Sequence, residues 1–352
     1  MSQIKHKTAY FAAANGYGGF RSYFDKIFDP SRHTRIFVLK GGPGTGKSTL
    51  MKKLLSEFDS GEYECEAIFC SSDPSSLDGA IIKNGERTVS VIDGTAPHET
   101  DARIPGAVDE IVNLGIGWDE ERLVSERETI ESIDRKKSSH YKNAYEYLSL
   151  AGRVNEKSNA IIEKAYKGRD TKQINDILFD IPFRDEDLLQ KTELLSSFSK
   201  DGYKTLDSSE RFKKGISVRG VFGSEFIFMG NLLSEIKRRN ADHIRFPSPY
   251  SDSDTEAIYL YSSDTFITTT DIYHDFIDTA AFVSEEAVLE NKEKLNYYAK
   301  LRRELCDRAK LELSLASKEH FELEKIYSPS MDYTVIDALT NHLTEKIKEY
   351  IL

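Results

Sequence analysis

The sequence lacks three things: a cysteine framework, a long apolar run and an excess of basic residues. Its three cysteines are too few for a disulfide framework or a set of zinc ligands, so we expect free thiols and a cytoplasmic location. No run of about 18 apolar residues occurs, which predicts that the chain does not span a membrane. The 48 basic and 59 acidic residues give a net charge of −11, which disfavours general binding to nucleic acid.

One glycine-rich stretch carries the strongest functional signal. Residues 36–39 are a short apolar run typical of a buried strand, and apolar residues recur at helical spacing from Leu50 to Phe58. Between them Gly41-x4-Gly46-Lys47-Ser48 matches the phosphate-binding P-loop pattern in its strand–loop–helix context. The pattern predicts that a nucleotide's phosphates are bound by Gly41, Gly42, Pro43, Gly44, Thr45, Gly46, Lys47, Ser48 and Thr49.

Each residue type in this stretch suits the chemistry. Glycine permits the backbone angles that turn successive amides toward an anion, and the amino end of a helix adds a favourable dipole. Lys47 can reach the β- and γ-phosphates, and the Ser48 hydroxyl can bind Mg²⁺. The metal also needs a carboxylate at the end of a neighbouring strand. Asp93 ends the run "RTVSVID" and is the candidate, although a turn residue before Gly94 is the alternative.

The residue that activates the attacking water or hydroxyl is less constrained. Asp73, His98 and Glu99 follow two predicted strands and should face the same edge of the sheet, as catalytic candidates or as plain turn residues. Position 94 is Gly, whereas many ATPases have Glu after the strand-end Asp, so this motif does not assign the base. ATP is favoured over GTP because the guanine-reading pattern Asn-Lys-x-Asp is not found; the nearest string, "NKEK", lacks the Asp.

A second stretch looks like a decayed copy of the first. "GVFGSEFIFMGNLLSE", residues 220–235, aligns with "GGPGTGKSTLMKKLLSE", residues 41–57, at offsets of 220 − 41 = 179 and then 232 − 54 = 178. Asp271 matches Asp93 at the same 178, and "EKIY" at 324–327 matches "EKAY" at 163–166 at 161. We therefore predict a duplicated core, with two unrelated α/β pieces as the alternative.

The differences between the copies predict one working site. Glu225 or Phe226 stands where the first copy has Lys47, and a carboxylate or ring there would exclude a polyphosphate. The fall in offset from 178 to 161 indicates that about 17 residues are missing after Asp271. The second core is then a scaffold without a nucleotide.

Long helical stretches follow each core. From Trp118 to Asp180 there is no proline, and residues 284–327 contain neither proline nor glycine. Such arms pack on each other or on their cores, or alternatively bind a protein or small-molecule partner. The predicted organisation is a nucleotide-binding core (1–117), a helical arm (118–195), a linker (196–214), a degenerate core (215–283) and a second arm with the C-terminal helix (284–352).

The segments "FAAANGYGGFRSYFDKI", "SSDPSSLDG", "DGTAPHE" and "PGAVDEIVNLG", with the P-loop pattern, resemble an uncharacterised family of bacterial P-loop ATPases. That family has two tandem P-loop domains with helical insertions. The resemblance implies an α/β fold with parallel sheets between helices, phosphate binding by Gly41 to Thr49, and Mg²⁺ binding by Ser48 and Asp93. It also places residues 15–20 near the site. The sequence departs from the tandem pattern at 220–226, and the family supplies no substrate.

These observations lead to three functional hypotheses. The first is an ATPase with one Mg·ATP site, in which nucleotide binding or hydrolysis moves the arms. The second is a phosphotransferase with an arm as the lid over an unknown acceptor. The third is a nucleotide-responsive binding module that does not hydrolyse.

Overall fold

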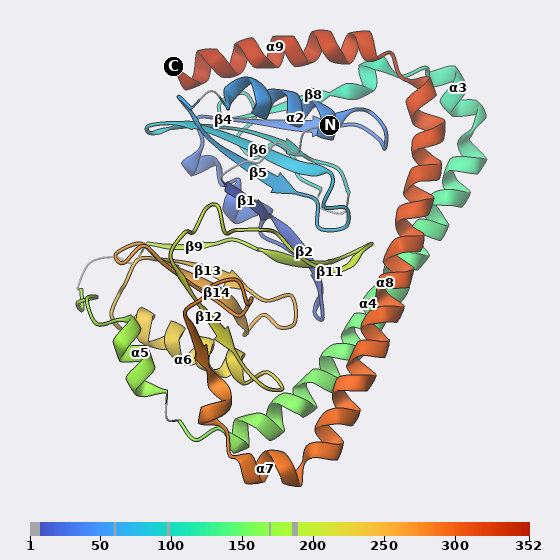
Figure 1. Cartoon of the computed structure of the whole chain (residues 1–352). Coiled ribbons are helices and arrows are strands. Elements are labelled where there is room, and N and C mark those ends of the chain that lie inside the picture. Colours follow the sequence, from blue (N-terminus) through green and yellow to red (C-terminus); the bar gives the residue numbers. More distant parts are fainter. Residues whose placement is uncertain (1–7, 60, 97–98, 169, 185–188) are drawn as a thin grey trace.

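The computed structural model describes residues 8–59, 61–96, 99–168, 170–184 and 189–352 (Figure 1). It contains two α/β cores, each built on a six-stranded sheet. The N-terminal core occupies the upper half of Figure 1 and the C-terminal core the lower half, and a pair of long helices runs beside both.

The sheet of the first core has the strand order β1-β5-β6-β7-β4-β8. Its elements are β1 (Thr8–Phe11), α1 (Phe24–Ile27), β4 (Arg35–Lys40), α2 (Lys47–Phe58), β5 (Glu64–Phe69), β6 (Leu77–Asn84), β7 (Arg87–Asp93) and β8 (Asp109–Asn113). Strand β4 is parallel to β7 and β8, whereas β6 is antiparallel to β5 and β7. The prediction of a parallel sheet is therefore wrong: the sheet is mixed, because β6 is joined to its neighbours by connections too short for parallel crossovers.

Strand β4 is buried on both faces and lies between β7 and the edge strand β8. Phe37 and Leu39 pack in the apolar layer that contains α2, and Ile36 and Val38 pack in the opposite layer with Phe24 and Phe28. Side chains of a strand alternate between its faces, so a continuous apolar run is what a strand covered on both sides requires. The loop that follows β4 is thereby fixed to a rigid base.

The second sheet has the order β16-β12-β15-β14-β13-β9, with the same pattern of parallel and antiparallel neighbours. Its elements are β9 (Gln190–Thr192), β12 (Gly215–Arg219), α6 (Ser224–Arg238), β13 (His243–Pro247), β14 (Thr255–Leu260), β15 (Thr265–Thr268) and β16 (Phe276–Asp278). The buried face of α6 repeats that of α2 at the offset of 178 found in the sequence, from Leu50 and Phe228 to Phe58 and Ile236. The duplication of an α/β core is confirmed.

The helical region links the two repeats. Its helices are α3 (Glu120–Ser125), α4 (Arg127–Ala165), α7 (Glu285–Glu290) and α8 (Lys292–Tyr327). α4 and α8 pack along each other in opposite directions, with His140 and Glu312 hydrogen-bonded at 2.7 Å between them (Figure 1). Because α4 starts at the first core and ends at the second, and α8 returns, each repeat sends its last helix to the other core.

This exchange determines which helix covers which sheet. α9 (Tyr333–Ile351), at the end of the second repeat, packs on the first core through Ile336, Leu343, Ile347 and Ile351. α5 (Thr171–Ile177), at the end of the first repeat, packs on the second core through Ile174. Neither core therefore has a complete apolar layer built from its own repeat alone.

Residues 196–214, predicted as a linker, include a hairpin that belongs to the second repeat. Strands β10 (Ser196–Ser199) and β11 (Gly202–Thr205) pair antiparallel, as do β2 (Ala13–Gly16) and β3 (Gly19–Ser22) of the first repeat. The linker prediction is wrong because a polar, serine-rich composition is also that of a strand pair whose serines are satisfied: all four residues of β10 are buried.

The helical pair also corrects the alignment of the repeats. Isolated bridges join Trp118 to Met331 and Tyr166 to Val283. The related positions therefore differ by 283 − 118 = 165 and by 331 − 166 = 165, not by the 161 that the sequence suggested. The "EKAY" match is displaced by four residues, about one helical turn. The loop after Asp271 is thus 178 − 165 = 13 residues shorter than its counterpart, rather than 17.

Candidate functional site

The loop of residues 41–46 joins β4 to α2 at the carboxyl end of β4. Gly44 and Gly46 have φ values of 67° and 87°, in the left-handed region that favours glycine. Gly46 caps α2 in this conformation, and the Thr45 hydroxyl donates to the Gly42 carbonyl at 2.9 Å. The loop folds back on itself before the amino end of α2, where exposed amides and the helix dipole favour an anion.

The side chain of Lys47 lies across this loop. Its Nζ donates to the carbonyls of Gly41 and Gly42, each at 2.9 Å, and lies 3.7 Å from Asp93 Oδ2. The Lys47 and Asp93 side chains are 12% and 14% exposed. The lysine and the strand-end carboxylate singled out in the sequence therefore lie side by side, and neutral carbonyls hold an ammonium that a phosphate can attract.

Asp93 and Ser48 present oxygens on the same edge of the sheet. Asp93 Oδ1 accepts from the Thr95 backbone N–H at 2.9 Å and from its hydroxyl at 2.5 Å, and Ser48 Oγ accepts from the Leu77 N–H at 3.0 Å. Mg²⁺ prefers such hard oxygens and usually takes only one or two protein ligands beside phosphate and water. The donor set fits that ion, and no group of three or more His, Cys, Asp and Glu that could hold a metal occurs among the described residues.

A buried carboxyl that the sequence analysis did not single out faces this pair. Asp78, near the start of β6, is 6% exposed. Burial, together with the charge of Asp93, raises the pKa of Asp78 to about 8, although a hydrogen bond with Cys70 and the charge of Lys47 act in the opposite direction. An aspartate inside the otherwise apolar run "LDGAII" was the signal that the sequence offered.

The three candidates for orienting a nucleophile have different surroundings. Asp73 accepts hydrogen bonds from the Ser75 N–H and hydroxyl at 3.1 and 2.6 Å, and from Lys200 Nζ at 2.5 Å. Burial acts to raise the pKa of Asp73, but these hydrogen bonds outweigh it and leave the pKa below its ordinary value. Glu99 is exposed and does not line the cavity in front of the loop. His98 lies outside the described residues.

That cavity has a volume of about 2100 Å³. One wall consists of residues 41–49, the whole set predicted to bind phosphates, with Asp93 and Thr95 beside them. The opposite wall belongs to α4 and α8, and includes Lys137, Tyr141, Tyr145, Arg153, Lys318 and Phe321. Small-molecule pockets usually measure about 300–1,000 Å³, so this cavity has room for a second ligand beside a nucleotide.

The junction of α8 and α9 touches the loop from the other repeat. Tyr333 OH donates to the Gly44 carbonyl at 2.6 Å. A Cβ on Gly44 would lie 2.5 Å from Ser328 Oγ, and one on Gly42 would lie 3.0 Å from the Tyr327 ring. Close packing favours glycine at both positions, and at Gly44 the left-handed backbone angle does so as well. The second repeat therefore sits directly on the loop.

The segment before β4 also reaches the cavity. Residues 17–19 line it. Asn15 is fully buried and donates from Nδ2 to the Phe198 carbonyl at 2.8 Å, while its Oδ1 accepts from Tyr145 OH at 2.9 Å. Asn15 thus ties the first repeat to both the second repeat's hairpin and α4.

In the second core the corresponding loop is filled by the side chain of Glu225. By the helical register Glu225 stands at the position of Lys47 (225 − 47 = 178), and like Lys47 it folds back over the first glycine. Its Oε2 lies 2.2 Å from where a Cβ on Gly220 would be. Burial raises the pKa of Glu225, and this oxygen has no hydrogen-bond partner. A carboxylate therefore occupies the place where a phosphate would have to enter.

Comparison with known proteins gives one partial similarity. A family model described as Nephrocystin 3, N-terminal, matches residues 21–80, from β3 into β6. That is 60 of 352 residues, too small a share to assign the chain to the family. No curated protein and no solved structure matches the chain. Within the described part of the chain, no helix has the length and apolarity needed to cross a bilayer.

Proposed function

We propose that this protein is a P-loop NTPase that binds Mg·ATP at one site per chain and hydrolyses it. The proposal is supported chiefly by Lys47, which lies over a loop with two left-handed glycines and 3.7 Å from the strand-end Asp93. A lysine has no structural need to be held by two backbone carbonyls beside a carboxylate. In the second core the half-buried Glu225 stands at the position of Lys47, which supports a single site.

In this proposal the residues of the first core have separate tasks. Lys47 exchanges its two carbonyl acceptors for phosphate oxygens. Ser48 and Asp93 would hold Mg²⁺, which would supply positive charge next to the phosphates. Asp78, whose pKa is raised to about 8, holds a proton next to Asp93 and is a further candidate for proton transfer at the sheet edge.

Transfer of the γ-phosphate to an acceptor other than water is the second candidate function. The cavity supports it, because a volume of about 2100 Å³ extends from the loop to α4 and α8 and exceeds what one nucleotide fills. The arms would then enclose an acceptor, whose identity the residues do not specify. A binding module that does not turn over ATP is the third.

Substitution of Lys47 tests the proposed site. Lys47→Ala should weaken ATP binding about tenfold or more, because a charge-assisted contact typically contributes about 1.5–3 kcal/mol. Lys53→Ala is the matched control: Lys53 lies on the same helix, is 55% exposed and pairs with Asp337. Calorimetry should show a loss only in the first variant. Equal ATP affinity in Lys47→Ala and wild type would remove this loop as the nucleotide site.

The fate of a radiolabelled γ-phosphate separates the three functions. Release of free phosphate from Mg·ATP by purified protein supports hydrolysis, and a labelled product formed only with a cell metabolite extract supports transfer. Binding without either product would leave the nucleotide-responsive module. Lys47→Ala should abolish whichever product forms.

A further inference from the structure

The hairpins of the two repeats cross over, so that each reaches the other core. The turn between β10 and β11 approaches the loop that follows β5, where the Lys200 N–H donates to the Ser72 carbonyl at 3.2 Å. Lys200 Nζ then pairs with Asp73 Oδ2 at 2.5 Å, and its side chain is 30% exposed. Lys200 lines the same cavity as Lys47, although it belongs to the second repeat.

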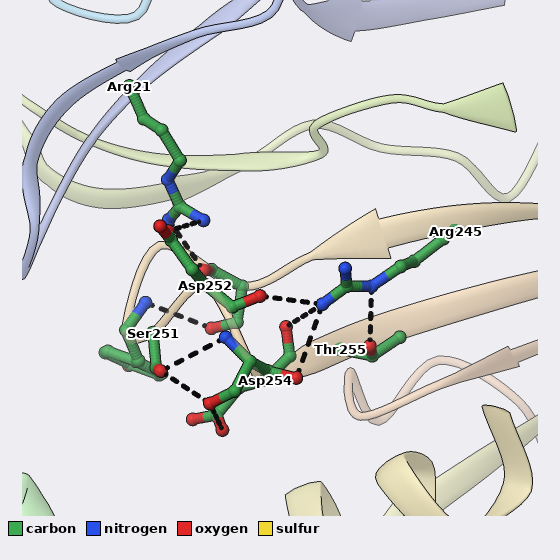
Figure 2. A network of polar contacts seen from close by, with 9 residues as sticks. Arg21, Arg245, Ser251, Asp252, Asp254 and Thr255 are labelled. Atoms are coloured by element: carbon green, nitrogen blue, oxygen red, sulfur yellow. Dashed lines mark hydrogen bonds and ion pairs between the residues drawn. The ribbon is translucent and has the colours of Figure 1, made fainter. Parts of the chain in front are cut away.

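The reciprocal contact is made on the other core. There the Tyr17 N–H donates to the Pro249 carbonyl at 2.9 Å, as Lys200 does to Ser72. Arg21 of β3 pairs with the Asp252 carboxylate and donates from Nη2 to the Ser248 carbonyl at 3.0 Å. Figure 2 shows Arg21 reaching Asp252 from above, whereas Arg245 reaches the same loop from the right. A hairpin cation and a loop aspartate thus meet on both cores.

The two contacts differ in what holds the loop. In the second core Arg245 Nη2 donates to the carbonyls of Asp252 and Ser253, at 2.8 and 3.3 Å, and its Nε donates to the Thr255 hydroxyl at 3.0 Å (Figure 2). The Arg245 guanidinium therefore holds this loop in place through these hydrogen bonds. In the first core the position of Arg245 is occupied by Ala67 (245 − 67 = 178), which is buried between strands.

The acidic side chains around the first site favour a second cationic side chain beside Lys47 when a triphosphate binds. Asp73 and Asp93 both line the cavity in front of the loop, so two acidic side chains already lie at this edge of the sheet. A nucleoside triphosphate would add negative charge beside them, with Lys47 already engaged by its own part of the phosphate chain. Lys200 lines that cavity, and Asp73, with which it pairs, also accepts hydrogen bonds from Ser75.

We propose that Lys200 is a phosphate-binding residue which the degenerate repeat supplies to the site of the first repeat. On binding of a nucleoside triphosphate, its ammonium leaves Asp73 and contacts the terminal phosphate. The inference rests on the proposed function of the first site. It gives the second repeat a direct part in the site, in place of the purely scaffolding role predicted from the sequence.

Affinities for ATP and ADP, each with Mg²⁺, test this assignment in the full chain. Lys200→Ala should raise the Kd for ATP about tenfold and change that for ADP less than twofold, because ADP lacks the phosphate that Lys200 contacts. Lys200→Arg should retain most of the ATP affinity, since it preserves the charge. Lys204→Ala is the control: Lys204 is exposed on the same hairpin and is absent from the cavity lining. Unchanged melting temperatures would show that all variants fold.

A double variant separates phosphate contact from neutralisation of Asp73. If Lys200 only cancels the charge of Asp73, then Lys200→Ala with Asp73→Asn should bind ATP as tightly as wild type. If Lys200 contacts the phosphate, the double variant should remain about tenfold weaker. Wild-type ATP affinity in either Lys200→Ala or the double variant overturns the assignment. Failure of the wild-type chain to bind any nucleotide overturns the proposed function as well.

Discussion

At the scale of single residues, the site contrasts two side chains at one helical position. Lys47 is the first residue of α2 and Glu225 the second residue of α6, and each folds back over the first glycine of the preceding loop. The lysine donates to carbonyls, whereas the glutamate brings a carboxylate to the place of an anion. The two cores therefore place side chains of opposite charge over corresponding loops, and in the second core the glutamate side chain itself occupies the loop.

Asp78 gives a residue-scale prediction about pH. Its pKa is raised from 3.8 to about 8, so between those values the unfolded chain releases a proton that the folded protein keeps. The folded state binds more protons, and the contribution of Asp78 to stability falls as pH rises through this range. Asp78→Asn removes that effect. The melting temperature of the nucleotide-free variant, relative to wild type, should therefore be higher at pH 8 than at pH 5.

Differential scanning fluorimetry at a series of pH values measures this difference. The comparison is made with wild type at each pH, because Glu225 and Asp254 also have raised pKa values and contribute to the absolute curve. A difference between variant and wild type that is the same at pH 5 and pH 8 would show that Asp78 is ionised normally.

Much of the residue-level site follows from the sequence, for a physical reason. The glycine spacing, Lys47 and Ser48 are local, since a loop between a strand and a helix brings them together without help from the rest of the chain. Asp93 could be found because it ends a strand. Asp78 stands out within an apolar run, but its position beside Asp93 depends on the direction of β6. Lys200 and Tyr333 could not be found, because their positions depend on a hairpin crossing and an exchanged helix, neither of which has a local pattern.

At the scale of elements, the exchanged terminal helices explain why the repeats cannot be separated. α9 supplies four buried apolar side chains to the layer of the first core that contains α2. The sequence predicted a C-terminal helix, but the core against which its apolar face packs is about 200 residues or more away in the sequence. The alignment of "EKAY" with "EKIY" was wrong by one helical turn in the same region. Similar residues recur at each turn of a long helix, so alignments that differ by one turn look equally good.

The packing of α9 gives an element-scale prediction. Leu343 is 1% exposed against the first core, and Leu343→Ala should destabilise the protein by about 2–5 kcal/mol, the usual cost of such a cavity. Leu311→Ala is the control, since Leu311 on α8 is 50% exposed. Urea unfolding should show the loss in the first variant only. Equal stability of the two variants would mean that α9 does not cover the first sheet in solution.

At the scale of the whole molecule, the duplication has produced two unequal halves that complete each other. The first core holds the glycine loop, and the second repeat sends to it α9, the junction at Tyr327 to Tyr333, and Lys200. The second core has lost both the lysine and 13 residues of the loop after Asp271. Each half relies on the other for its apolar cover, so the single-site proposal still gives the second core a necessary part in the fold.

The number of nucleotides bound per chain tests the single-site proposal most directly. Equilibrium dialysis with radiolabelled ATP and Mg²⁺ should give one ATP per chain in wild type, and a large loss of binding with Lys47→Ala. Glu225→Lys should still give one, because a lysine alone does not rebuild the shortened loop after Asp271. Two ATP molecules per wild-type chain, falling to one with Lys47→Ala, would contradict the proposal and show that the second core is a working site.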